Sequence, residues 1–387
     1  MTYNFDKIID RHHTYSTQWD YVQDRFGQND ILPFSISDTD FPTSNEIIEA
    51  IKQRMRHPIF GYTRWNHAAY KQSIKTWFER DKRVTVQTDW IAYSPSVVYT
   101  IGKFLHFVSE PGDSVAIFSP MYDAFFNTIC ANNRQIAPIN IASAEEHYQI
   151  DWDALAIVLA QKKTTTLLLT NPHNPTGHLF SYKELARIVS LCQKNHVFII
   201  SDDIHRDIIV GDQPYTPITT ITTKNVVLCC ANTKTFNTPG LIGAYVLIPD
   251  SKLRDRYLTA LKKEDALSSA SIFGIESVIH GYNESADYVK ELNQYLRQNY
   301  QILTKFLKTE LPEIYFVKPE ATYLAWLNVS KLNMSSQQLQ NKLVNVGKVG
   351  IMPGNTYGAS DHIRMNIGCP KGKLIEGLNR MKVALHS

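Results

Sequence analysis

Short apolar runs recur through the middle of the chain, and segments with helical periodicity separate them. The clearest runs are Ser114–Phe118, Thr166–Thr170, Val197–Ile200 and Val226–Cys230. Runs without polar alternation are typical of parallel strands that are buried on both faces, and the intervening helices provide the cover. The sequence therefore predicts an α/β fold in which a mostly parallel sheet lies between helices.

The helices that separate these strands carry signals of their own. Ser181 and Glu184 have the spacing of a capping box, and apolar residues recur at helical intervals up to Cys192, so a helix is predicted over 181–195. Two earlier helices are predicted, one beginning at Ser44 and one over 68–80.

The C-terminal quarter has a different pattern. A long helix is predicted over 285–307, followed by a hairpin from 314–317 and 323–327, a strand near 363–367 and a last helix. This order indicates a second, smaller α+β domain. We therefore predict an N-terminal arm over 1–45 that joins the small domain, a large domain over 46–285, and the small C-terminal domain over 286–387.

Composition narrows the class of protein. The chain has 387 residues, 43% of them hydrophobic, and a formal net charge of +3, which gives no electrostatic argument for binding nucleic acid or an acidic membrane. The first residues do not resemble a secretory signal, and no apolar run is long enough to span a membrane. The five cysteines lack metal-ligand spacing, so we expect free thiols packed in the core of a cytoplasmic protein.

Four segments at predicted strand ends or helix starts carry polar residues that a core does not require. They are Ser94–Val98, Ser119–Tyr122, the loop Thr170–Gly177 with its two Asn-Pro steps, and Ser201–His205. Because ligand-binding residues gather at the carboxyl ends of parallel strands, these segments can share one site. A turn that opens a helix offers N–H groups to a phosphate, and two adjacent aspartates need a cationic partner if they are buried.

Each segment also has an ordinary structural interpretation. These are a helix cap, a half-buried tyrosine, a turn built from turn-forming residues, and a solvated loop or a metal pair. A metal is disfavoured because no further ligands follow at a recognisable spacing.

Lys234 lies just beyond the run Val226–Cys230, between Thr233 and Thr235, and before a turn at Pro239. Partial desolvation there lowers a lysine pKa and makes the amine a nucleophile that can form a Schiff base with an aldehyde cofactor. For this motif alone, a surface lysine just past a strand is the alternative.

In chain order, the phosphate turn, the aromatic residue, the asparagine loop, the strand-end aspartate and the lysine resemble the pyridoxal 5′-phosphate (PLP) enzymes of fold type I, the aspartate aminotransferase fold. The resemblance runs over nearly the whole chain. It is more specific for the cystathionine β-lyase branch, the MalY/PatB type of C–S lyase. The segments that carry it are Phe34–Phe41, Phe60–Trp65, Asn171–Gly177, Ala266–Ser269, Ala321–Leu327, Ile351–Gly358 and Arg364–Pro370.

The resemblance implies a role for each residue that matches the family motifs. Lys234 would form the Schiff base with PLP and move the proton at the substrate α-carbon, and Asp202 would keep the pyridinium protonated. Tyr122 would stack on the ring, and Asn174 would bind its phenolic oxygen and the substrate carboxylate. His205 would lie against the cofactor, where aminotransferases usually have tyrosine.

Phosphate and substrate binding are implied in the same way. The amides of Val97 and Val98 would hold the phosphate with the help of Thr233. Tyr62 would reach the phosphate from the neighbouring subunit of a homodimer. Arg364 would clamp the substrate carboxylate, a task that suits a planar guanidinium.

The sequence departs from the family pattern at three other positions. Ile242 stands where many aminotransferases place an arginine on the phosphate, and Ala231 stands where a phosphate-binding serine is common. Both changes predict weaker phosphate binding unless Thr233 or Thr235 compensates. Asp203 stands where glutamate is usual, and we expect little effect from it.

The resemblance implies a PLP-dependent carbon–sulfur β-lyase that eliminates the thiol from cystathionine or related S-substituted cysteines. The products are a thiol (homocysteine from cystathionine), pyruvate and ammonia. An aminotransferase with the same site is the first alternative. The second is a regulatory protein that holds PLP and contacts a transcription factor, because the resemblance extends to a bacterial modulator of the maltose regulon.

Overall fold

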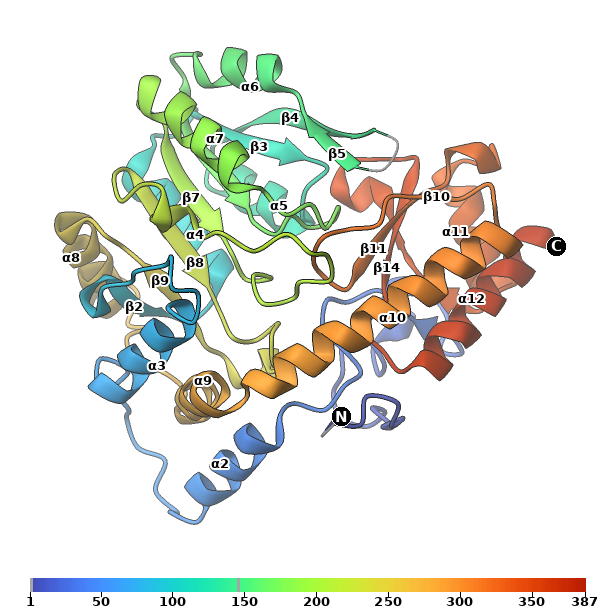
Figure 1. Cartoon of the computed structure of the whole chain (residues 1–387), viewed down its shortest axis with the longest axis horizontal. Helices are drawn as coiled ribbons and strands as arrows, with labels where there is room; N and C mark the ends of the chain where they lie inside the picture. The colour runs from blue at the N-terminus through green and yellow to red at the C-terminus, as the bar shows by residue number, and fades with distance from the viewer. Residues whose placement is uncertain (1–2, 145–146) are drawn as a thin grey trace.

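The computed structural model describes residues 3–144 and 147–387, and an eight-stranded sheet forms its larger part (Figure 1). In spatial order the strands are β2 (Ile91–Ser94), β9 (Ala244–Leu247), β8 (Val226–Cys230), β7 (Phe198–Asp202), β6 (Thr164–Thr170), β3 (Ser114–Ser119), β4 (Gln135–Ala144) and β5 (His147–Ile150). The strands from β8 to β4 are parallel, and the pairs that involve β9 or β5 are antiparallel. The predicted α/β fold with a mostly parallel sheet is confirmed.

The helices lie around this sheet, in the N-terminal segment and in the C-terminal part. They are α1 (Val22–Phe26), α2 (Asn45–Met55), α3 (Ala68–Phe78), α4 (Val97–Val108), α5 (Asp123–Ala131), α6 (Trp152–Leu159), α7 (Tyr182–Lys194), α8 (Ser251–Thr259), α9 (Ile272–Glu284), α10 (Ala286–Glu310), α11 (Ser336–Asn345) and α12 (Lys371–His386). The capping box of α7 forms as expected. Figure 1 shows α10 running from α9 beside the large sheet to α11 and α12 at the other end of the molecule.

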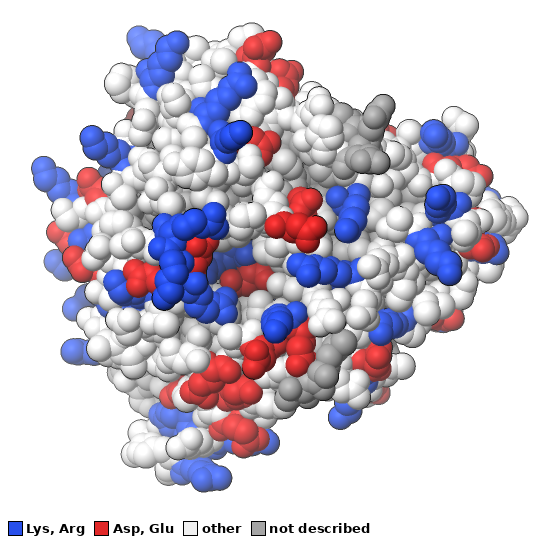
Figure 2. All heavy atoms as spheres, in the orientation of Figure 1, with Lys and Arg blue, Asp and Glu red and all other residues white. Residues whose placement is uncertain are grey.

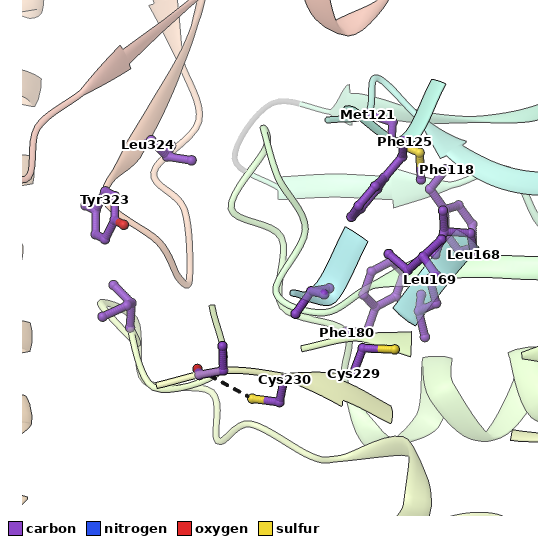
Figure 3. Packing of buried hydrophobic residues seen from close by; sticks show 14 of the residues in the cluster. Phe118, Met121, Phe125, Leu168, Leu169, Phe180, Cys229, Cys230, Tyr323 and Leu324 are labelled. Atoms are coloured by element: carbon purple, nitrogen blue, oxygen red, sulfur yellow. Dashed lines mark hydrogen bonds between the residues drawn. The ribbon is translucent and has the colours of Figure 1, made fainter. Parts of the chain in front are cut away.

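The centre of the large sheet is buried on both faces. Leu167, Leu168 and Leu169 follow one another in β6, so their side chains alternate between the faces, and all three are fully buried. Figure 3 shows Leu168 and Leu169 packed with Phe118 and Phe180, whose rings lie 5.2 Å apart. This two-sided burial explains why the strands appear in the sequence as continuous apolar runs.

A second, four-stranded antiparallel sheet is formed by the C-terminal part. Its order is β10 (Tyr315–Phe316), β11 (Leu324–Asn328), β14 (His362–Asn366) and β13 (Met352–Pro353). The predicted hairpin is therefore present, although only two residues of its first arm, Tyr315 and Phe316, enter the ladder.

The N-terminal segment returns to this C-terminal part. β1 (Leu32–Pro33) pairs in parallel with β12 (Val349–Gly350). Phe34 packs so closely on α12 that a Cβ at Gly377 would lie 2.3 Å from its ring. These contacts agree with an arm that joins the small domain, and the boundaries at 45/46 and 285/286 remain predictions.

Two sequence expectations need correction. Ser201 and Asp202, placed after the strand, form its last two residues because the ladder with β6 continues to Thr170 and Asp202. Cys130 is exposed, whereas the other four free cysteines are buried as expected, because Cys130 lies on the outer side of α5.

Basic and acidic side chains are mixed over the face seen in Figure 2. Within the described residues no helix is both long and apolar enough to cross a membrane.

Candidate active site

A cavity of about 510 Å³ opens at the carboxyl ends of β6, β7 and β8. It brings together the residues that the sequence placed at strand ends and turns: Val97, Val98, Tyr122, Asn174, Asp202, His205, Thr233 and Lys234. Parallel strands end at the same edge of a sheet, which is why segments more than a hundred residues apart meet here.

The start of α4 forms one wall of the cavity. Ser96 is the N-cap residue, and its hydroxyl accepts a hydrogen bond from the Tyr99 N–H at 3.0 Å. Val97 and Val98 are the first helical residues, so their N–H groups have no partner inside the helix. Together with the hydroxyl of Thr233, which lines the same cavity, this helix end fits a phosphate group.

Asp202 lies at the end of β7 with one side of its carboxyl group toward the cavity. Only 4% of the residue is exposed, and Oδ1 accepts a hydrogen bond from the Ile204 N–H at 3.1 Å. Burial raises the pKa of the carboxyl to about 7, and the charge of Lys234 opposes this rise only in part. A buried carboxyl with unused acceptor capacity fits a protonated ring nitrogen, the partner that PLP would supply.

Lys234 lies beyond β8, in the wall of the same cavity. Its Nζ donates a hydrogen bond of 2.7 Å to the Ser37 carbonyl. Burial lowers the pKa of this amine to about 8, and the positive charge of Arg364 lowers it further, against the opposing effects of Asp38 and Asp202. The amine is therefore closer to its neutral, nucleophilic form than a surface lysine, as the sequence predicts.

Arg364 on β14 supplies a buried cation beside Asn174. Nη1 donates to Asn174 Oδ1 at 3.1 Å, Nη2 donates to the Ser35 carbonyl at 3.0 Å, and Nε is buried without a partner. The guanidinium lies 4.4 Å from the centre of the Tyr357 ring. No carboxylate among the described residues forms an ion pair with it. Arg364 therefore fits a carboxylate ligand that enters from outside the chain.

Two aromatic side chains complete the described cavity. Tyr122 is half-buried just before α5, with its ring edge-on to Phe125 at 5.3 Å. His205 is buried, and burial lowers the pKa of its imidazole to about 3, so the ring is neutral at physiological pH. Its Nδ1 is buried without a hydrogen-bond partner. The two rings offer a flat apolar surface and an unused polar atom to a planar ligand.

Two of the three positions that depart from the family pattern, Ile242 and Ala231, also line this cavity. Ile242 and Ala231 contribute no charge, and Lys234 is the sole lysine or arginine in the lining given by the described residues. Ile242 has a positive φ of 53°, which is rare for a β-branched residue, so its position is held by its neighbours. A phosphate bound here would be held by N–H groups and hydroxyls of this chain.

Tyr62 is not in the cavity. Its side chain is 100% exposed on the segment between α2 and α3, so its expected role needs a second subunit and remains a prediction.

The sequence did not predict which backbone carbonyls accept hydrogen bonds from Lys234 and Arg364. Ser37 and Ser35 accept their hydrogen bonds from 197 and 329 residues away. The segment Phe34–Phe41 stood out in the sequence, yet nothing in it indicated which carbonyl would meet which side chain. In the part of the chain that the structure describes, no cluster of three or more His, Cys, Asp or Glu side chains could hold a metal ion.

The α/β fold and this cavity, with a buried lysine and an aspartate at a strand end, are typical of PLP-dependent enzymes. Residues 29–381 match the model of the family "Aminotransferase class I and II", and the chain belongs to this family. It is 39% identical to Protein MalY of Escherichia coli over 97% of each chain. It is 33% identical to cystathionine beta-lyase PatB of Bacillus subtilis, with 99% of this chain and 100% of PatB covered.

Solved structures give the same picture. A PLP-bound putative aminotransferase from Clostridium difficile has a TM-score of 0.95 at 32% identity, covering 99% of this chain and 100% of that one. A PLP-bound C-S lyase from Staphylococcus hominis has a TM-score of 0.93 at 26% identity, covering 100% and 98%.

Proposed function

We propose that the protein is a PLP-dependent carbon–sulfur β-lyase that converts cystathionine or related S-substituted cysteines to a thiol, pyruvate and ammonia. The observation that carries the proposal is one cavity in which Lys234 has a lowered pKa and Asp202 forms no ion pair among the described residues. The guanidinium of Arg364, which has no carboxylate partner in the same residues, adjoins it through Asn174. The names of PatB and of the C-S lyase from Staphylococcus hominis support the choice of reaction.

Different residues of the cavity would bind different parts of the cofactor. The N–H groups of Val97 and Val98 would hold the phosphate, and Asp202 would hold the ring nitrogen in its protonated form. When bound, PLP supplies an electron sink for the substrate α-carbon. Asn174 would hydrogen-bond the phenolic oxygen of the ring, and Tyr122 would cover its face.

Lys234 and Arg364 carry the proton transfer and the orientation. Arg364 binds the substrate α-carboxylate and so fixes which bonds of the α-carbon face Lys234. The neutral amine of Lys234 removes the α-proton, the electron pair of that bond forms a double bond between the α- and β-carbons, and the thiolate leaves with the electron pair of the C–S bond. Hydrolysis of the unsaturated amine that remains then gives pyruvate and ammonia. The pKa of about 8 leaves part of the amine unprotonated near neutral pH.

Incubation with cystathionine, with and without an α-keto acid, tests the reaction. A lyase releases pyruvate and free thiol in equal amounts without the keto acid, and Lys234→Ala loses at least about a thousandfold in kcat/KM. A strict requirement for the keto acid, with amino transfer to it, would identify an aminotransferase. If Lys234→Ala turns over at the wild-type rate, the proposed site is wrong.

We further propose a homodimer in which Tyr62 reaches the phosphate of the neighbouring subunit. The support is an exposed apolar cluster at the end of α2 and on the segment that follows it. The cluster consists of Met55, Ile59, Phe60 and Tyr62. Mixing inactive Tyr62→Ala and Lys234→Ala subunits tests it. In a mixed dimer one site keeps both residues, so activity returns if Tyr62 acts across the interface and stays absent if it acts within its own chain.

A cytoplasmic location is proposed from the five free cysteines, four of them buried, because a reducing compartment preserves thiols. A regulatory protein partner remains a prediction from the sequence resemblance. A surface variant that loses such a partner in a pull-down while keeping lyase activity would establish it.

A further inference from the structure

A second cavity, of about 280 Å³, lies between the end of α3, the loop after β7 and α10. Two arginines line it, Arg80 and Arg206. The guanidinium of Arg206 lies 3.5 Å from the centre of the Phe78 ring, and that of Arg80 lies 3.1 Å from the Trp77 ring. Both cations are thus positioned by aromatic faces, which leaves the edges of the guanidinium groups for hydrogen bonds.

Arg206 is buried without the hydrogen bonds that a buried guanidinium needs. Its side chain is 4% exposed, its nearest acid oxygen is Asp207 Oδ1 at 3.5 Å from Nε, and Nε has no hydrogen-bond partner. None of its nitrogens donates a side-chain hydrogen bond to any residue within 3–144 or 147–387. A buried charged group that lacks hydrogen bonds is costly, so a ligand that supplies acceptors lowers the free energy of this site.

Asp207 cannot satisfy both arginines. Its carboxylate already accepts hydrogen bonds from Trp77 Nε1 at 3.0 and 3.1 Å and from Thr235 Oγ1 at 2.8 Å. The other acid in the lining, Asp81, is ion-paired with Arg83 at 2.6 Å. The lining therefore has an excess of positive charge, because Asp207 is the acid available to balance the two arginines.

One further carboxyl lies near Arg206. Asp203 does not line the cavity and accepts hydrogen bonds from the hydroxyls of Ser201 and of Tyr215, which does line it. Burial raises the pKa of Asp203 to about 7, so near neutral pH it cancels the excess positive charge only in part.

We propose that this second cavity binds a small oxyanion, a carboxylate or a phosphate, between Arg80 and Arg206. The volume suits an ion of that size, and two guanidinium groups can bind it through paired N–H donors. The site is separate from the PLP cavity, since the two linings share no residue. The proposal does not depend on the lyase reaction.

Titration calorimetry of the PLP-loaded enzyme tests the site, using inorganic phosphate and, separately, malonate at constant ionic strength. PLP fills its own phosphate site, and Arg364→Gln shows whether malonate binds instead at the substrate position. Lys82→Gln is the matched control, because Lys82 is exposed close to Arg80, does not line the cavity and forms no ion pair among the described residues.

We expect one saturable site for at least one of the two anions. Its affinity falls about tenfold or more in Arg80→Gln and in Arg206→Gln and is unchanged in Lys82→Gln and Arg364→Gln. Arg80 is exposed, so its variant tests the site even if Arg206→Gln fails to fold. Absence of saturable binding for both anions, equal affinity in Arg80→Gln and wild type, or loss confined to Arg364→Gln overturns the proposal.

Discussion

Asp202 and Asp203 are adjacent, both are buried, and burial raises the pKa of both carboxyls to about 7, yet their surroundings differ. Asp203 accepts hydrogen bonds from two hydroxyls, those of Ser201 and Tyr215. Asp202 accepts one hydrogen bond, from the Ile204 N–H, and lines the larger cavity. A shifted pKa alone therefore does not separate a functional carboxyl from a structural one, whereas unused acceptor capacity facing a cavity does.

The same comparison applies to cations. Among the described residues, Arg364 has amide and carbonyl partners without a carboxylate. Arg206 has an ion pair with Asp207 at 3.5 Å, and its Nε has no hydrogen-bond partner. Each guanidinium therefore has donor groups that a bound anion can use. By contrast, Lys373 and Arg11 are both ion-paired with Asp40, at 2.5 and 2.8 Å, and we assign them a structural role.

Replacing each aspartate by asparagine separates the two roles, and this is the largest effect we expect. Asp202→Asn lowers kcat/KM for cystathionine by about a hundredfold or more, because the ring nitrogen loses its counter-charge. Asp203→Asn changes kcat/KM by less than about threefold and lowers the free energy of unfolding by about 1–2 kcal/mol, since one oxygen acceptor is lost. Steady-state kinetics and urea unfolding measure the two quantities.

Equal losses of activity in the two variants would contradict the comparison. So would a stability loss in Asp202→Asn as large as that in Asp203→Asn, since the carboxyl of Asp202 has only one neighbour in the chain to lose.

The sequence predicted the elements that determine the fold. Runs such as Val226–Cys230 are buried on both faces, so a continuous apolar segment predicts the strand without knowledge of its neighbours. It also predicted most of the cavity, because polar residues at strand ends mark the edge where parallel strands terminate together.

The remainder of the site depends on contacts that no local pattern records. The carbonyls of Ser35 and Ser37 meet Arg364 and Lys234 because β1 pairs with β12 and carries the N-terminal segment into the C-terminal part. The second cavity escaped notice for the same reason. Arg80 and Arg206 are 126 positions apart by their numbering, and each alone is an ordinary arginine after an element end.

Arg364→Lys tests whether the free guanidinium binds the substrate. Lysine keeps the charge and loses the planar pair of donors, so we expect KM for cystathionine to rise and kcat/KM to fall about 10–100-fold, with little change in stability. Steady-state kinetics with thermal unfolding as a control measure this. Arg25→Lys is a matched conservative control in the N-terminal part. A wild-type KM in Arg364→Lys would place the carboxylate elsewhere.

A further predicted effect is on the pH dependence of stability. A carboxyl whose folded pKa is raised from 3.8 to about 7 keeps its proton in the folded state while the unfolded state has released it. Stability from each aspartate is therefore full below about pH 4 and is lost as the pH rises towards 7. In the cofactor-free protein we expect each carboxyl to contribute about 1–3 kcal/mol to this fall.

Loading with PLP separates the two contributions. A protonated ring nitrogen stabilises the charged form of Asp202, so its pKa falls and its share of the slope disappears, while Asp203, which does not face the cavity, keeps its share. Urea unfolding from pH 4 to 7 measures this in two single variants. Asp203→Asn, which retains only Asp202, should show a slope that PLP removes. Asp202→Asn should show a slope that PLP leaves unchanged, and the reverse pattern would assign the ring nitrogen to Asp203.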